Sequence, residues 1–153
     1  MMFRGIANLS VDAKGRVAVP KVHRDRLEAD NITELMVTID PDRCLLIYTM
    51  DRWRELEQSI MSLPNTSAYN RGLQRTYVGH ATELELDGNG RVLIPAALRE
   101  YANIKKKAVM LGQGHKLELW SEEEWQEKSS AYPAMLTDTP PESLSEEARN
   151  LSI

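Results

Sequence analysis

Apolar and polar residues alternate in two short stretches of the chain, residues 7–11 and residues 82–86. An alternation with a period of two is typical of a strand that turns one face to the core and the other to solvent. Each stretch is soon followed by a short β-branched run, at residues 17–19 and 92–94. We therefore expect two similar units of strand, turn and strand.

The two stretches belong to an internal repeat. Residues 12–20 are DAKGRVAVP and residues 87–95 are DGNGRVLIP, and each proline is followed four residues later by an arginine, Arg24 or Arg99. These identities share an offset of 75 positions, and after a gap of three residues the similarity resumes at an offset of 72. A unit of about forty-five residues has been duplicated, which defines the architecture before any propensity is considered.

Each repeated phrase predicts the tight turn of a hairpin. Asp12 and Asp87 occupy the first turn position, and Gly15 and Gly90 occupy the fourth. This pattern fits a type I turn closed by a glycine in the left-handed conformation, which other residues resist. We expect each β-branched run to return beside the strand that precedes its own turn.

A short helix is expected after each hairpin. Pro20 and Pro95 suit the first position of a helix, because the fixed φ of proline fits there and its missing N–H is not needed. The two helices are expected to end near Ala29 and Tyr101.

The second half of each repeat predicts another pair of strands. These strands are residues 35–39, 44–48, 108–111 and 117–120. Residues 41–43 and 112–114 are expected to carry the turns within the two pairs. Thr49 and Ser121 then stand as helix N-caps, and Ser121 with Glu124 completes a capping box.

Residues 54–80, between the repeats, are expected to be helical. Apolar residues follow helical spacing at Trp53, Leu56, Ile60 and Leu63. Residues 64–66 break this helix, and a second helix over residues 68–77 has Ser67 as its cap. Trp53 and its counterpart Trp125 are expected to anchor the core.

With the duplicated Asp-x-x-x-Arg phrases, at Asp12/Arg16 and Asp87/Arg91, the chain resembles the MraZ family of bacterial transcriptional regulators. The two halves of that family resemble the swapped-hairpin DNA-binding domains of the AbrB class. The resemblance covers nearly the whole chain and implies a mainly β fold with short helices (α+β). In this fold, two pseudo-symmetric AbrB-like swapped-hairpin repeats form one compact body.

The resemblance also implies a function and partners. We expect a sequence-specific regulator, a repressor, of the division and cell-wall gene cluster. It would bind double-stranded DNA at tandem repeats in the promoter region of its own gene. A ring-like homo-oligomer in the cytoplasm, associated with the nucleoid, is implied as well.

The expected organisation has four parts: repeat 1 at residues 5–53, a helical connector at 54–80, repeat 2 at 81–125 and an acidic tail at 126–153. Each repeat is near the size at which one hydrophobic core is marginal, so the two should bury their apolar faces together. Serines and prolines should interrupt any helix after Trp125, and we expect residues 133–153 to be mostly tail, in which Glu142 to Leu151 could form one or two short acidic turns.

The net charge of −4 does not by itself favour DNA binding, but its distribution does. From Ser121 onward there are eight acidic and two basic residues, so residues 1–120 carry a net charge of +2. A local basic surface can contact phosphate even when the whole molecule is anionic. Since Lys14 is answered by Asn89 and Lys21 by Ala96, we expect repeat 1 to make most of the DNA contact.

The candidate site combines basic DNA-contacting residues with residues that shape the turns. The expected DNA-binding residues are Arg4, Lys14, Arg16, Lys21, Arg24, Arg91 and Arg99. The expected turn-forming residues are Asp12, Gly15, Asp87 and Gly90. A structural alternative is that Arg16 and Arg91 mainly pair with the aspartate of their own turn, and both roles are compatible for a guanidinium with several donors.

Other classes of protein remain as alternatives. Cys44 with His80 or His115 could form a nucleophile and base, but Cys44 lies in an apolar run, so we expect no enzyme. One cysteine and three scattered histidines favour neither a metal nor any other cofactor. No apolar run is long enough to cross a membrane, and the start of the chain lacks the pattern of a signal peptide. An antitoxin-like or structural oligomeric interaction module of the same fold is the remaining alternative.

Overall fold

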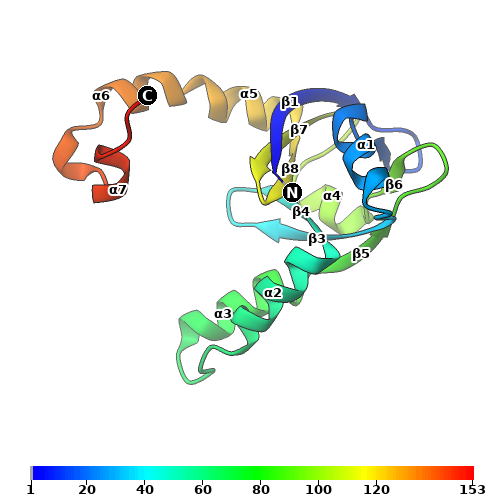
Figure 1. Ribbon diagram of the computed structural model, residues 1–153, viewed down its shortest axis with the longest axis horizontal. Coiled ribbons are helices and arrows are strands. Elements are labelled where there is room, and N and C mark those ends of the chain that lie inside the picture. The colour runs from blue at the N-terminus through cyan, green and yellow to red at the C-terminus, as the bar shows by residue number, and fades with distance from the viewer. Residues whose placement is uncertain (1) are drawn as a thin grey trace. The chain divides into compact units, whose positions relative to one another are not determined.

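The computed structural model describes residues 2–153 and has the mixed α+β fold expected from the sequence (Figure 1). The chain divides into two compact units, one that ends at Glu122 and one that spans Glu123–Ile153. The first unit contains every strand. Both repeats therefore form one body, as predicted.

Six strands form an antiparallel sheet in the order β1-β7-β8-β4-β3-β5. Their bounds are β1 Phe3–Ser10, β3 Glu34–Asp40, β4 Cys44–Thr49, β5 Thr82–Glu85, β7 Lys107–Gly114 and β8 Lys116–Ser121. A separate two-stranded ribbon consists of β2 (Arg16–Ala18) and β6 (Arg91–Leu93). The counterparts in the two repeats are β1 and β5, β3 and β7, and β4 and β8. Exchanging each strand for its counterpart gives the same order read from the opposite edge of the sheet. The duplicated sequence therefore produces a fold with pseudo-two-fold symmetry.

The first strand of each repeat pairs with the other repeat, which corrects the expected hairpins. β1 pairs with β7 over eight residues, β5 pairs with β3, and β2 pairs with β6. The turn closes locally, where the N–H of Asp12 donates to the carbonyl of Arg16 at 3.0 Å. Beyond that closure β2 has only three residues before Pro20, whereas β7 offers β1 a long ladder. The swapped arrangement thus forms within one chain.

The core lies between the sheet, the ribbon and two short helices. One face of the ribbon buries Val17 and Val92 against the sheet. Helix α1 (Lys21–Ala29) contributes Leu27, and α4 (Ala96–Tyr101) contributes Leu98. Both helices end where predicted, but Pro20 and Pro95 are their N-caps and not their first residues.

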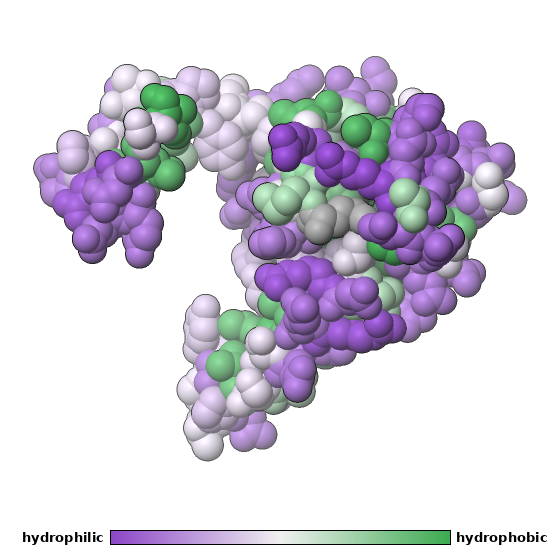
Figure 2. All heavy atoms as spheres, in the orientation of Figure 1, coloured by the Kyte–Doolittle hydropathy of each residue, from purple (hydrophilic) through white to green (hydrophobic). Residues whose placement is uncertain are grey.

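The connector forms two helices, α2 (Met50–Met61) and α3 (Ala68–Tyr77), as predicted. Thr49 and Ser67 cap them by accepting hydrogen bonds from backbone N–H groups in the first turns. Trp53 is buried, with its ring 5.8 Å from that of Tyr48, so it is a core anchor. On the face shown in Figure 2, hydrophobic residues show among these helices, whereas hydrophilic residues predominate over α1.

Three local expectations were wrong. The β7–β8 turn lies at His115, because residues 112–114 continue β7 opposite β1. Trp125, on α5 (Glu122–Ser130), is only half-buried and stacks edge-on against Tyr132. Residues after Tyr132 form the helix α6 (Tyr132–Asp138), although Pro133 was expected to interrupt any helix there. The other elements of the tail, η1 (Pro141–Ser143) and α7 (Glu146–Arg149), lie where one or two short turns were expected. Pro133 is tolerated because it lies in the first turn of α6, where no N–H is needed.

Within residues 2–153 the structure has no helix of the length and apolar character needed to cross a membrane.

Candidate nucleic-acid interface

The turn of repeat 1 is organised by the carboxylate of Asp12. Its Oδ1 accepts hydrogen bonds from the backbone N–H of Lys14 at 2.9 Å and of Arg16 at 2.8 Å. The N–H of Gly15 donates to the carbonyl of Asp12 at 3.0 Å, and Gly15 has a φ of +92°. The sequence predicted this geometry, since only glycine adopts such a φ without strain. Lys14 is exposed at the tip of the turn.

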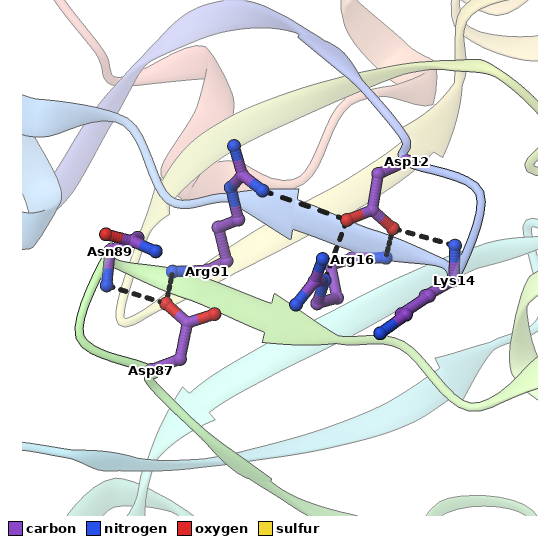
Figure 3. Close-up of polar contacts among 6 residues, drawn as sticks. All are labelled: Asp12, Lys14, Arg16, Asp87, Asn89 and Arg91. Atoms are coloured by element: carbon purple, nitrogen blue, oxygen red, sulfur yellow. Dashed lines mark hydrogen bonds and ion pairs between the residues drawn. The ribbon is translucent and has the colours of Figure 1, made fainter.

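The turn of repeat 2 has the same geometry. Oδ1 of Asp87 accepts from the backbone N–H of Asn89 at 2.8 Å and of Arg91 at 3.0 Å. Gly90 has a φ of +73°. The duplicated phrases therefore build duplicated turns, which lie at opposite ends of the β2–β6 ribbon (Figure 3).

The side chains of the two arginines converge on one carboxylate (Figure 3). Nε of Arg16 donates to Oδ2 of Asp12 at 2.7 Å, which is the pairing within one turn that the sequence suggested. Nη1 of Arg91 lies 3.9 Å from the same Oδ2. Arg91 contacts Asp87 through its backbone N–H, and its guanidinium turns toward the other repeat. The expected symmetry of the ion pairs is thus broken.

The hydrogen bonds lower the pKa of both turn carboxyls. The pKa of Asp12 falls to about 2, mainly because the backbone N–H and then the side chain of Arg16 donate to it. The pKa of Asp87 is also lowered, first by the N–H of Arg91 and then by that of Asn89. Both groups are therefore charged at neutral pH and hold the turns through charge-assisted hydrogen bonds.

The outer face of the ribbon presents two arginines and two apolar residues. Arg16 lies opposite Leu93, and Ala18 lies opposite Arg91. Because side chains alternate along a strand, these four residues share the face opposite buried Val17 and Val92. Leu93, the last residue of β6, is 54% exposed and adds an apolar side chain to this face. The sequence pattern gave no reason to single out Leu93.

The other basic candidates lie in different environments. Arg4 is exposed on edge strand β1, opposite Gln113 of β7. Lys21 is exposed at the start of α1, and its Nζ lies 2.7 Å from Oδ2 of Asp25. The pair is solvated on both sides, so it leaves the lysine accessible.

Arg24 and Arg99 lie on the turns of the opposite repeats. Nη1 of Arg24 donates to the carbonyl of Asn89 at 3.2 Å, and the Arg24 side chain covers Gly90. The side chain of Arg99 covers Gly15, while its Nε donates to the carbonyl of Ile94 at 3.0 Å. Both arginines are half-buried. These contacts depend on the strand exchange, so the linear sequence could not predict them.

The residues of the catalytic alternative lie in different environments. Cys44 is buried in β4, where burial raises the pKa of its thiol, while His80 and His115 are exposed. A raised pKa disfavours the thiolate that a nucleophile requires. Among the described residues, 2–153, there is no group of three or more metal-ligating side chains.

Known proteins match both halves of this chain. A family model described as "MraZ protein, putative antitoxin-like" matches residues 2–76 and again residues 77–145. A relative from Thioalkalivibrio sulfidiphilus (strain HL-EbGR7) is 52% identical over 124 residues, which cover 81% of this chain and 83% of the relative. One from Hydrogenovibrio crunogenus (strain DSM 25203 / XCL-2) is 46% identical over 154 residues, covering 100% and 99%. One from Legionella pneumophila (strain Corby) is 45% identical over 147 residues, covering 94% and 97%.

Each of these relatives is named "Transcriptional regulator MraZ". The duplicated fold, the paired turns and these matches define the class, a two-repeat transcriptional regulator. The chain belongs to the MraZ family.

Proposed function

We propose that the protein regulates transcription by binding double-stranded DNA in a sequence-specific manner through the outer face of the β2–β6 ribbon. The observation that carries this proposal is the placement of Arg16 and Arg91 on that one face, with the exposed Lys14 at the adjoining turn. The major groove of DNA is wide enough to admit a two-stranded ribbon. A ribbon with both arginines on its free face has the shape and the charge for such an insertion.

The chemistry of the ribbon supports recognition of base edges. Asp12 holds Arg16 by its Nε, so the terminal nitrogens of this guanidinium remain as donors for the O6 and N7 atoms of a guanine. Leu93, opposite Arg16, offers an apolar surface that suits a thymine methyl group. Lys14 supplies a flexible charge for phosphate. The ribbon therefore carries groups for both base and backbone contacts.

The two repeats contribute unequally in this proposal. The turn of repeat 1 offers Lys14 where repeat 2 offers the neutral Asn89, and α1 begins with Lys21 where α4 begins with Ala96. Since phosphate contacts supply most of the sequence-independent affinity, we assign the larger share of binding to repeat 1. We assign Arg4, which is exposed near the start of β1, a further contact with phosphate.

The connector helices support self-association into a ring-like homo-oligomer. Tyr69 of α3 is 77% exposed and Met61 of α2 is 52% exposed. Leu56, Leu73 and Tyr77 line a hollow of about 280 Å³ between these helices and the sheet. Exposed apolar and aromatic side chains on helices that also line an apolar hollow are typical of a protein interface. Replacing Tyr69 by Asp should lower the mass of the particle in light scattering without unfolding it.

The resemblance to regulators of the family extends the proposal to the target. In this proposal the protein acts on the nucleoid in the cytoplasm and represses the division and cell-wall gene cluster from tandem repeats upstream of its own gene. A ring presents the ribbon several times, so a second ribbon meets the next DNA repeat at high effective concentration. Affinity should then rise steeply with the number of repeats.

The deciding experiment is a mobility shift with DNA from upstream of the gene, carrying one, two or three repeats at fixed salt. A specific shift that is lost in Arg16→Ala but kept in Arg75→Ala, a matched arginine exposed on α3, supports the proposal. The absence of any specific shift by the intact oligomer would contradict it and favour an antitoxin-like or structural module. Equal affinity per site for DNA with one and with three repeats would show that the ring does not contribute to DNA binding.

A further inference from the structure

The two arginines that follow the prolines, Arg24 and Arg99, do not lie free on the surface as solvated cations. Each is half-buried, and each covers a turn glycine of the other repeat. A Cβ atom built on Gly15 would lie 2.6 Å from Nε of Arg99, and one built on Gly90 would lie 2.9 Å from Nη1 of Arg24. A larger residue at either position would have to displace the arginine, so the glycines leave room for the guanidinium groups.

The backbone reinforces these contacts in the same places. The N–H of Ile94 donates to the carbonyl of Gly15 at 3.0 Å, and the N–H of Val19 donates to the carbonyl of Gly90 at 2.9 Å. The carbonyl of Ile94 in turn accepts from Nε of Arg99 at 3.0 Å. Gly15, Ile94 and Arg99 therefore form a chain of contacts from helix α4 to the turn of repeat 1.

From this geometry we propose that Arg24 and Arg99 are positioning residues, which act as latches that fix the DNA-contacting turn of the opposite repeat. Arg99 of repeat 2 holds the turn that carries Lys14 and Arg16. Arg24 of repeat 1 holds the turn that carries Asn89 and Arg91 through the carbonyl of Asn89. The inference rests on the proposed DNA binding, but it assigns these two arginines a role other than contact with DNA.

The crossed arrangement has a distinctive consequence. The turn with the extra cation belongs to repeat 1, whereas its latch belongs to repeat 2. Loss of Arg99 should therefore weaken DNA binding more than loss of Arg24, although repeat 2 is the less basic of the two. If the two arginines instead contacted phosphate directly, there would be no reason to expect a larger loss of DNA binding from Arg99 than from Arg24.

Two substitutions separate a latch from a direct contact. Arg99→Lys keeps the positive charge but places a methylene where Nε donates to Ile94, whereas Arg99→Gln loses the charge and keeps an N–H at that position. A latch predicts that Arg99→Lys weakens binding to the upstream DNA by about two- to tenfold, the effect of one net hydrogen bond. Arg99→Gln should bind more tightly than Arg99→Lys. A phosphate contact predicts the reverse order.

The salt dependence of DNA binding is a second way to distinguish a latch from a direct phosphate contact. Removing a phosphate contact lowers the slope of log K against log salt by about one. For a latch, Arg99→Gln should leave the slope unchanged, whereas Lys14→Gln, as the contact control, should lower it. A lowered slope in Arg99→Gln would overturn the inference.

Amide hydrogen exchange tests the latch without DNA. In the full-length protein, Arg99→Lys should accelerate exchange at Lys14 and Arg16, in the opposite repeat, more than at Asn89 and Arg91. Arg24→Gln, which removes the Nη1 that donates to the carbonyl of Asn89, should do the converse, and Arg75→Lys should change neither. Unchanged exchange at the opposite turn would overturn the latch even if DNA binding is confirmed. A protein with the crossed exchange pattern but no specific DNA binding would keep the latch and refute the proposed function.

Discussion

Nη1 of Arg91 lies 3.9 Å from Oδ2 of Asp12, the same oxygen that accepts from Nε of Arg16 at 2.7 Å. One carboxylate therefore restrains arginines of both repeats, whereas Asp87 bonds only backbone N–H groups among the contacts identified for its side chain. The pseudo-two-fold axis relates the turns but not their ion pairs. Several expected outcomes depend on this asymmetry.

Replacing Asp12 by Asn should weaken specific DNA binding by about two- to fivefold, because the amide can still cap the turn but cannot hold two cations. Asp87→Asn is the matched control and should change affinity less. Titration of the same DNA with both variants measures the difference. Equal losses would show that the shared carboxylate does not orient the arginines.

Replacing Arg16 by Ala should cost on the order of 1–3 kcal/mol of binding free energy per protomer, as expected for loss of a bidentate base contact. Arg91→Ala should cost less, since fewer cations surround it. Calorimetric titration compares the two, and thermal unfolding checks the fold. A large loss of thermal stability in Arg16→Ala would instead favour a purely structural role for the pair of Asp12 and Arg16.

Exchanging the two turn tips tests the unequal share of the repeats. Lys14→Asn should lower the slope of log K against log salt by about 0.9, the release of one counterion. Asn89→Lys should raise the slope by a similar amount if its turn also faces phosphate. Affinity measured at several salt concentrations gives both slopes. If neither substitution changed the slope, the turn tips would not contact the DNA backbone.

Neither half of the chain should fold alone. Separate chains of residues 2–65 and 66–153 leave β1 without β7 and β5 without β3. We expect each half to lack dispersed amide signals, and an equimolar mixture to recover them. Truncation after residue 138 is the control and should leave unfolding of the sheet unchanged. A dispersed spectrum from residues 2–65 alone would contradict the obligatory exchange of strands.

Stability should fall on mild acidification because of His23. Burial, and then the charge of Arg26, lowers the pKa of this imidazole below its ordinary value of 6.5, and its ring lies 5.4 Å from that of Phe3. Above pH 6.5 the group is neutral in both states and its contribution is complete. As pH falls below 6.5 the unfolded chain binds the proton first, so stability is lost at no more than about 1.4 kcal/mol per pH unit.

The variant His23→Leu provides the control, since the counterpart of His23 in repeat 2 is the buried Leu98. Chemical unfolding between pH 5 and pH 7 should show a steeper dependence for the native sequence than for the variant. Asp12 and Asp87, whose pKa values are lowered from 3.8, affect stability only in stronger acid. Parallel curves for the two proteins would refute the role of His23.

Features set by neighbouring residues were predictable from the sequence. The turn conformations of Gly15 and Gly90, the caps at Thr49 and Ser67, and the β3–β4 and β7–β8 pairs all depend on contacts a few residues apart. The partner of β1 was not predictable, because β7 lies about a hundred residues away and the alternation pattern specifies a face, not a neighbour. Trp125 shows the same limit, since its counterpart Trp53 is buried but Trp125 is not.

In the candidate site, too, the features set by neighbouring residues were predictable and those set by distant contacts were not. The DxxxR phrases identified the turns, and the location of Lys14 at a turn tip followed from the turn type. The sharing of Asp12 by Arg91, and the contacts of Arg24 and Arg99 with the opposite turns, arise only when the repeats exchange strands. Leu93 was missed because its exposure depends on which face of the ribbon the core covers.

The palindromic order of the strands has a consequence for the orientation in which the ribbon would bind DNA. A homodimer with a true two-fold axis must present the same residue at both ends of its ribbon and matches inverted DNA sequences. Joining both units in one chain frees the two ends to diverge, as Lys14 and Asn89 have done. The two ends of the ribbon are thus chemically different. If the ribbon binds DNA as proposed, its two unlike ends suit sequence elements that follow one another in the same orientation along DNA. A symmetric dimer would bind such an element equally well in either direction.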